Sequence, residues 1–128
     1  MIVDTSALLA IIFAEPEAVA FIDAILAEGG ATMSAASYLE AALRLDRRLG
    51  MRDPELDAMI EALAIDVVPV SVEHGRVSRT AAIRFGGAPA GLNFGDCLTY
   101  ALAKTSGEPL LFKGKDFIHT DLPLATAA

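Results

Sequence analysis

The sequence predicts an α/β fold with a central, mainly parallel sheet. Short runs that indicate strands alternate along the chain with longer helical segments, the order that a parallel sheet covered by helices requires. The chain has 128 residues, of which 54% are hydrophobic, enough for the core of one compact domain and too few for two. We therefore predict one domain over residues 1–128, with 121–128 as a candidate flexible tail.

The first half of the chain predicts two strands and three helices. The apolar N-terminal run ends at Asp4, and hydroxyl residues then turn into an apolar helix. Pro16, between two acids, marks the start of a second helix, which a pair of glycines stops. A brief strand and a long helix that ends at Gly50 follow. The predicted elements are strand 1–4, helix 7–13, helix 18–28, strand 31–33 and helix 34–49.

The second half predicts three helices and two strands. Asp53 before Pro54 caps a helix, and the β-branched run that follows indicates a strand. The glycine-rich stretch 86–91 can only be a loop between two helices, and a Ser-Gly-Glu-Pro turn precedes the last strand. The predicted elements are helix 54–64, strand 65–70, helix 72–85, helix 94–105 and strand 110–113.

Composition excludes several classes of protein. The longest uninterrupted apolar run, 7–14, is shorter than the roughly 18 to 20 residues of a membrane-spanning helix, and no basic region precedes it, so we expect a cytoplasmic protein without a membrane segment. The single cysteine, Cys97, allows no internal disulfide and no recognisable zinc cluster. The formal net charge of −7 argues against a general nucleic-acid coat, although a nuclease stays open because its metal ions invert the local charge.

Four carboxylates lie at or near the edges of strongly apolar segments, where an unpaired charge is costly to bury. Asp4 ends the first strand and Asp116 follows the last one, so both could face the crevice at the carboxyl ends of a parallel sheet. Oxygen ligands gathered from distant segments suit Mg²⁺ or Mn²⁺. The candidate metal ligands and catalytic residues are Asp4, Glu40, Asp96 and Asp116.

Each of these acids also has a structural interpretation. Asp4 and Asp96 could simply cap the helices that follow or contain them. Glu40 could complete a capping box with Ser37 or form an ion pair one turn along its helix, and Asp116 could be a turn residue. If they do cluster, like-charge repulsion should raise the pKa of at least one of them in the metal-free protein.

The helix at 34–49 carries three arginines beside Glu40. At about 100° per residue they share one face with it, opposite Leu39, Ala42 and Leu49. A carboxylate beside arginines fits a metal site bordered by phosphate contacts, although such a face is more often merely solvated. As a hypothesis, the phosphate contacts are Arg44, Arg47, Arg48, Lys113 and Lys115.

Four segments together resemble the PIN-domain ribonucleases of the VapC toxin type. The segments are Ile-Val-Asp-Thr-Ser-Ala at 2–7, Ser-Tyr-Leu-Glu at 37–40, Asn-Phe-Gly-Asp-Cys at 93–97 and Leu-Leu-Phe-Lys-Gly-Lys-Asp-Phe at 110–117. Each is weak alone, but their order and spacing span nearly the whole chain and make a specific signal.

The resemblance implies a PIN-like three-layer sandwich and cleavage of RNA phosphodiesters with Mg²⁺ or Mn²⁺. It also implies a homodimer and a cognate VapB-type antitoxin, through which any contact with DNA would be indirect. By position, Asp4 and Asp96 match the core metal ligands of the family, while Glu40 and Asp116 match the other acids of the site. Thr5 or Ser6 matches the small hydroxyl residue that the family places beside the metal.

Two other functions remain open on sequence grounds. A Mg²⁺-assisted phosphatase or phospho-acceptor domain is disfavoured, because such proteins usually pair the first Asp with a second nearby Asp, and Asp4 has none beside it. A non-catalytic dimeric protein-interaction module would suit the apolar composition. Metal dependence separates it from a nuclease, since only the nuclease would lose its activity in chelator.

Overall fold

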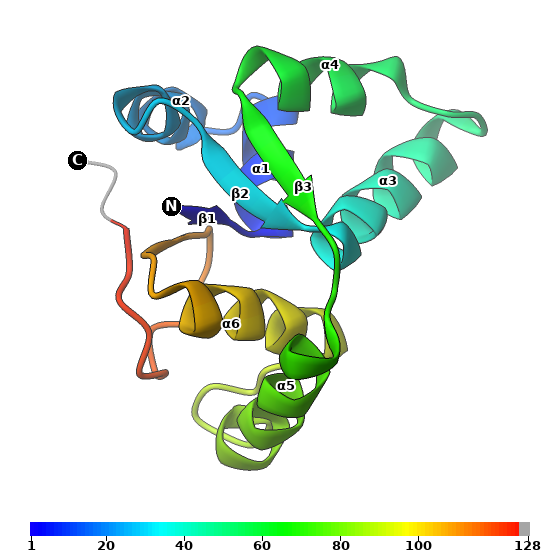
Figure 1. The fold of residues 1–128 in the computed structure, drawn as a ribbon. Helices are drawn as coiled ribbons and strands as arrows, with labels where there is room; N and C mark the ends of the chain where they lie inside the picture. The colour runs from blue at the N-terminus through cyan, green and yellow to red at the C-terminus, as the bar shows by residue number, and fades with distance from the viewer. Residues whose placement is uncertain (126–128) are drawn as a thin grey trace.

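The computed structural model describes residues 1–125, which contain four strands and six helices (Figure 1). The strands are β1 (Ile2–Val3), β2 (Ala31–Ser34), β3 (Ile65–Val68) and β4 (Leu110–Leu111). The helices are α1 (Thr5–Ile12), α2 (Ala18–Ala27), α3 (Ala35–Leu49), α4 (Pro54–Ala62), α5 (Val72–Phe85) and α6 (Phe94–Ser106).

The four strands form one parallel sheet in the order β3-β2-β1-β4. Helices α5 and α6 lie on one side of it, and α1, α2 and α4 lie on the other (Figure 1). A parallel sheet between two helical layers is the arrangement that alternating strands and helices predict, so the expected three-layer fold is confirmed.

Neighbouring strand residues point into opposite cores. Val3 and Leu111 pack in the core formed with α1 to α4, whereas Ile2 and Leu110 pack in the core formed with α5 and α6. All four are at most 1% exposed. Because successive side chains of a strand alternate between faces, a sheet covered on both faces needs the continuous apolar runs that the sequence shows.

Several predicted boundaries are shifted, each for a local reason. Helix α1 begins at Thr5, two residues before the predicted start, because the Asp4 side chain already accepts a hydrogen bond from the N–H of Ser6 (3.0 Å). Strand β3 ends at Val68 rather than 70, since Ser71 caps the helix α5 that follows. The longest helix, α3, has 15 residues, and no helix among residues 1–125 is both long and apolar enough to span a membrane.

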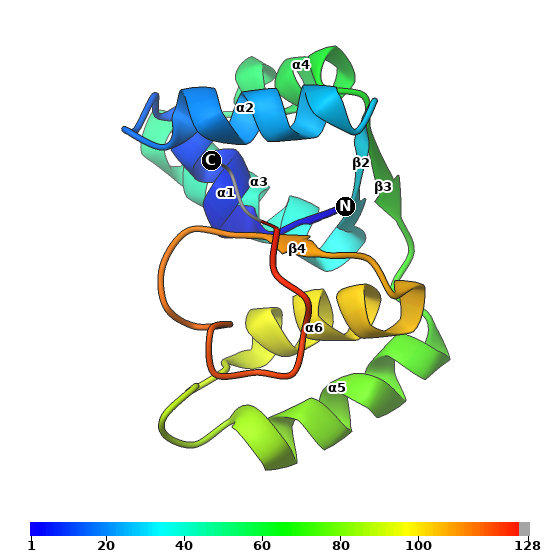
Figure 2. The ribbon, with the colours of Figure 1, turned by 90° about the vertical axis from the view of Figure 1, so that its left-hand side faces the viewer.

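The segment after residue 120 packs against the domain as far as it is described. The Asp121 carboxylate accepts hydrogen bonds from Tyr100 Oη (2.6 Å) and Lys104 Nζ (3.0 Å), and Leu122 is buried. Leu124 forms a parallel bridge with Leu110 at the edge of β4, where Figure 2 shows the red end of the chain beside the sheet. The rest of the predicted tail, 126–128, lies outside the described residues.

Candidate functional site

The four predicted acids lie around one cavity of about 230 Å³ at the carboxyl end of the sheet. Asp4 directly follows β1 and Asp116 lies in the turns after β4, while Glu40 lies on α3 and Asp96 in the first turn of α6. Segments more than 100 residues apart in sequence therefore line the same cavity. The lining residues are Asp4, Thr5, Ser6, Leu9, Glu40, Arg44, Asp96 and Asp116.

Asp4 is the most buried of the four acids, with 5% of its surface exposed. Its Oδ1 accepts a hydrogen bond from Thr99 Oγ1 (2.8 Å). Its Oδ2 accepts two, from the N–H (3.0 Å) and the hydroxyl (2.6 Å) of Ser6. The two interpretations of Asp4 therefore coexist, because the same carboxylate caps α1 and lines the cavity.

Glu40 reaches the cavity from α3 without a capping role. The N-cap of that helix is Ser34, so Ser37 and Glu40 do not form a capping box. Instead, Glu40 Oε1 accepts a hydrogen bond from Thr5 Oγ1 (2.8 Å). A Cβ atom built on Gly95 would lie 2.2 Å from Glu40 Oε2, so the carboxylate occupies space that only glycine leaves free.

Asp96 has a pKa raised from its ordinary 3.8 to about 6. Partial burial is the largest cause, and the negative charges of Asp4, Asp116 and Glu40 raise the pKa further. A hydrogen bond from the N–H of Asn93 to Oδ2 (3.1 Å) acts in the opposite direction. The expected pKa shift among clustered acids is therefore present, with burial as its leading cause.

The oxygen donors of the cavity suit a hard divalent cation, but they are not gathered around one point. Within residues 1–125, no three Asp, Glu, His or Cys side chains are placed to hold one ion together. The carboxylates are turned toward hydroxyl and amide donors instead, as Asp4 is toward Thr99 and Asp96 toward Asn93. Carboxylate and hydroxyl oxygens are the kind of ligand that Mg²⁺ and Mn²⁺ prefer. A bound cation would also offset the repulsion between the carboxylates that raises the pKa of Asp96.

The basic residues near the cavity differ in what they are free to do. Arg44 lines the cavity one turn beyond Glu40, and its guanidinium lies over the ring of Phe13, 5.5 Å from the centroid. Lys113 Nζ, in contrast, forms ion pairs with Glu15 (2.7 Å) and Glu17 (3.1 Å). The hypothesis that Lys113 contacts phosphate is therefore disfavoured, because its charge is already neutralised.

The predicted apolar face of α3 is wrong. Leu39 is 56% exposed and Leu49 is 49% exposed, whereas the helix buries Ser37, Ala41 and Leu45. Apolar residues occur on two arcs of this helix, and the sequence alone did not indicate which arc meets the sheet. The helix therefore keeps an apolar stripe on its outer side, next to the cavity.

A family model described as "PIN domain" matches residues 1–122. The chain belongs to the PIN-domain family. "Ribonuclease VapC30" of Mycobacterium tuberculosis is 46% identical over 127 residues, which cover 95% of each chain. "Ribonuclease VapC28" of the same species is 48% identical over 132 residues, covering 98% of this PIN domain and 97% of the relative. The resemblance to VapC-type PIN-domain proteins is thus confirmed.

A solved structure has the same fold. It is described as "Toxin-antitoxin complex from Klebsiella pneumoniae", and it superposes with a TM-score of 0.71 over 99% of this chain and 97% of that chain. The two sequences are 16% identical, so this likeness supports the PIN fold alone.

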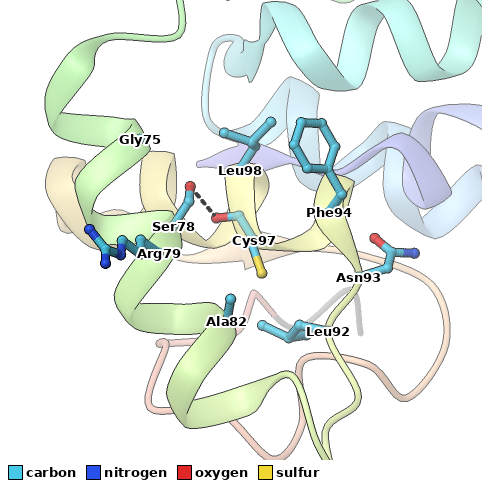
Figure 3. A pocket seen from close by; sticks show the side chains of 9 residues that line it. All are labelled: Gly75, Ser78, Arg79, Ala82, Leu92, Asn93, Phe94, Cys97 and Leu98. Atoms are coloured by element: carbon cyan, nitrogen blue, oxygen red, sulfur yellow. Dashed lines mark hydrogen bonds between the residues drawn. The ribbon is translucent and has the colours of Figure 1, made fainter.

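A second cavity of the PIN domain, about 320 Å³ in volume, lies between α5 and α6. Figure 3 shows Cys97, Leu92 and Ala82 close together between the two helices, and Phe94 and Leu98 also line the cavity. Among residues 1–125, no carboxylate side chain lines this cavity. Cys97 is buried, and burial raises the pKa of its thiol.

Three residues beside the acids were not predicted from sequence. Ser37 and Thr99 are buried hydroxyls behind Asp4, and Gly95 makes room for Glu40. The only sequence signal for Thr99 is a hydroxyl residue among apolar neighbours in a helix. Ser37 was assigned to a cap, which the start of α3 at Ala35 excludes.

Proposed function

We propose that this protein is a divalent-metal-dependent endoribonuclease, the toxin component of a toxin–antitoxin module. The observation that carries the proposal is that four carboxylates, from the residue after β1, from α3, from α6 and from the segment after β4, line one cavity. The names of two relatives, "Ribonuclease VapC30" and "Ribonuclease VapC28", support the choice of RNA as substrate.

In this proposal Asp4, Glu40, Asp96 and Asp116 would hold Mg²⁺ or Mn²⁺. When bound, such an ion lowers the pKa of a water molecule and stabilises negative charge on the phosphate. Asp4 is the fixed ligand, because both of its oxygens are already oriented by hydrogen bonds. Asp116 is exposed and Glu40 is held by one hydroxyl, so these two side chains can adjust to the ion.

The substrate backbone would meet positive charge at one side of the cavity. Arg44 lines it, and Arg48 on the next turn of α3 lies over the same Phe13 ring, 4.7 Å from the centroid. Stacked guanidinium groups are held in place and can still donate hydrogen bonds to phosphate oxygens. The site would thus bind RNA locally, although the chain as a whole is acidic.

A homodimer and a VapB-type antitoxin complete the proposal. An apolar surface beside the active-site cavity suits an interface, because Leu39, Leu43, Phe94 and Leu98 line one hollow between α3 and α6. Phe94 is 85% exposed and Leu39 is 56% exposed in the single chain. The proposal includes a cytoplasmic location, where cellular RNA would be accessible to the enzyme.

The test is cleavage of total cellular RNA by purified protein, free of antitoxin, with Mg²⁺, with Mn²⁺ and with chelator. Wild type should cut only with metal, and Asp4→Ala and Asp96→Ala should not cut. A matched control is Asp23→Ala, an acidic residue of α2 that is absent from the cavity lining. Equal cutting by all variants would indicate a contaminant, and no cutting under any condition would favour the non-catalytic interaction module.

A further inference from the structure

Both carboxylate oxygens of Asp4 are held by hydroxyl groups that are themselves anchored. Ser6 Oγ donates to Oδ2 (2.6 Å) and accepts from the backbone N–H of Lys113 (2.9 Å), just after β4. Thr99 Oγ1 donates to Oδ1 (2.8 Å) and lies 3.0 Å from Ser37 Oγ. Asp4 is therefore fixed from two sides, by the end of β4 and by the helices α3 and α6.

The direction of the second chain of hydrogen bonds follows from counting protons. A threonine hydroxyl has one proton, and the Thr99 proton points to Asp4. Ser37 must then donate to Thr99 Oγ1, which gives the order Ser37 to Thr99 to Asp4. Ser37 and Thr99 are 2% and 1% exposed, so bulk water does not reach their hydroxyls to replace a lost partner.

Ser37 also lies close to the group that holds Glu40. Thr5 Oγ1 is 2.8 Å from Glu40 Oε1 and 3.1 Å from the backbone oxygen of Ser37. The first turn of α3 thus contacts the hydroxyls that hold two acids of the site. Neither Ser37 nor Thr99 lines the cavity, so both act only through other residues.

We propose that Ser37 and Thr99 are positioning residues, whose hydroxyl chain orients the Asp4 carboxylate for a divalent cation. This inference rests on the proposed metal-dependent function. Hydrogen-bond partners of metal-binding side chains typically change metal affinity or activity by about 10- to 100-fold when they are removed. The role is worth testing apart from catalysis, because it predicts an effect on metal binding itself.

The decisive variant is Thr99→Val, which keeps the shape of the side chain and removes the donor. Its dissociation constant for Mn²⁺, measured by electron paramagnetic resonance on the full chain with the metal alone, should rise by about 10-fold or more. The Mn²⁺ concentration for half-maximal RNA cleavage should rise by the same factor. Thr99→Ser restores the hydroxyl and should bind Mn²⁺ within about 3-fold of wild type, a rescue that a purely structural role of the methyl group would not give.

Ser37→Ala is the second variant, and it decides the question if Thr99→Val does not fold. Ser37→Ala keeps the Thr99 hydroxyl that donates to Asp4 but removes the hydrogen bond from Ser37 to Thr99. We therefore expect a smaller loss of Mn²⁺ affinity than in Thr99→Val, about 3-fold. The control is Ser78→Ala, because Ser78 is 9% exposed and its hydroxyl donates to the backbone oxygen of Cys97 in α6 (3.0 Å), not to Asp4. Its Mn²⁺ affinity should match wild type.

Unchanged Mn²⁺ affinity in folded Thr99→Val and Ser37→Ala would overturn the positioning role, as would a Thr99→Ser variant as weak as Thr99→Val. Asp4→Ala separates this failure from failure of the proposed function. If Asp4→Ala loses Mn²⁺ binding while the hydroxyl variants keep it, only the positioning role is wrong. If Asp4→Ala binds Mn²⁺ like wild type, the metal site itself is wrong.

Discussion

Substituting Asn for Asp96 should stabilise the metal-free protein while it removes activity. Burial and three neighbouring carboxylates disfavour the charged form of Asp96, which is the cause of its raised pKa. Asparagine has no charge to bury, and its side-chain oxygen can still accept the hydrogen bond from the N–H of Asn93. The substitution keeps the shape of the side chain and removes only its charge, so it should raise the free energy of unfolding of the metal-free protein.

The magnitude follows from the difference between a pKa of about 6 in the folded chain and 3.8 in the unfolded chain. At about 1.4 kcal/mol per pH unit the gain has a ceiling of about 3 kcal/mol. The carboxylate is partly exposed, and screening by water reduces this to about 1 to 2 kcal/mol. The folded chain binds the Asp96 proton more tightly than the unfolded chain does. The free energy of unfolding of wild type is therefore lowered in full above pH 6, relative to Asp96→Asn, and this difference vanishes as pH falls through 3.8.

Urea unfolding in chelator measures this gain directly, at pH 7.5 and again near pH 4. The advantage of Asp96→Asn should be present at the higher pH and nearly absent at the lower one. Asp121→Asn is the control of opposite sign. The hydrogen bond from Tyr100, followed by that from Lys104, lowers the pKa of Asp121 to about 2, so this variant should lose about 1 kcal/mol at pH 7.5. An Asp96→Asn variant that is less stable than wild type at pH 7.5 would refute the electrostatic account.

Four further substitutions test the surroundings of the acids and the proposed dimer interface. Gly95→Ala should lower RNA cleavage by about 10-fold, because its Cβ displaces the flexible Glu40 carboxylate. The thermal midpoint of unfolding should not fall, since alanine is favourable within a helix. An unchanged cleavage rate would contradict the close approach of Gly95 and Glu40. Arg44→Ala should weaken binding of RNA to catalytically inactive protein by about 5-fold, as measured by fluorescence anisotropy. Lys113→Ala should leave the RNA affinity within about 2-fold of the parent, because Lys113 is occupied by its ion pairs. Equal losses of affinity in the two variants would contradict that assignment of Lys113. Leu39→Glu should convert the proposed dimer to a monomer in light scattering after size exclusion, and a persistent dimer would place the interface elsewhere.

The backbone architecture was predictable from local signals, and the site only in outline. Short apolar runs and clear helix stops such as Gly50 and Gly107 mark where elements begin and end, and the parallel sheet then brings Asp4 and Asp116 to one edge. What the sequence did not contain is which side of an amphipathic helix faces inward. Leu39 and Leu45 are both leucines of the same helix, yet Leu39 is exposed and Leu45 is buried. The position of α3 against the sheet decides which of them faces the core.

The same limit applies to the groups that hold the acids. Thr99 lies 95 positions from Asp4 in sequence, and only the packing of α6 against β1 brings its hydroxyl to the carboxylate. The pairing of Lys113 with Glu15 and Glu17 likewise joins segments that no local pattern connects. Local features such as helix caps and helix ends can therefore be predicted from sequence, whereas the partners of a buried charge depend on tertiary contacts.

The most direct test of the central claim is the chemistry of the RNA ends, determined on one short RNA cut by chelator-treated protein after Mn²⁺ is restored. A metal-activated water attacks the phosphate without help from the neighbouring 2′-hydroxyl. We therefore predict cleavage that depends on Mn²⁺, is lost in Asp4→Asn and leaves no 2′,3′-cyclic phosphate. Cleavage that persists in chelator, or fragments that end in 2′,3′-cyclic phosphate, would contradict a nuclease built on these four carboxylates.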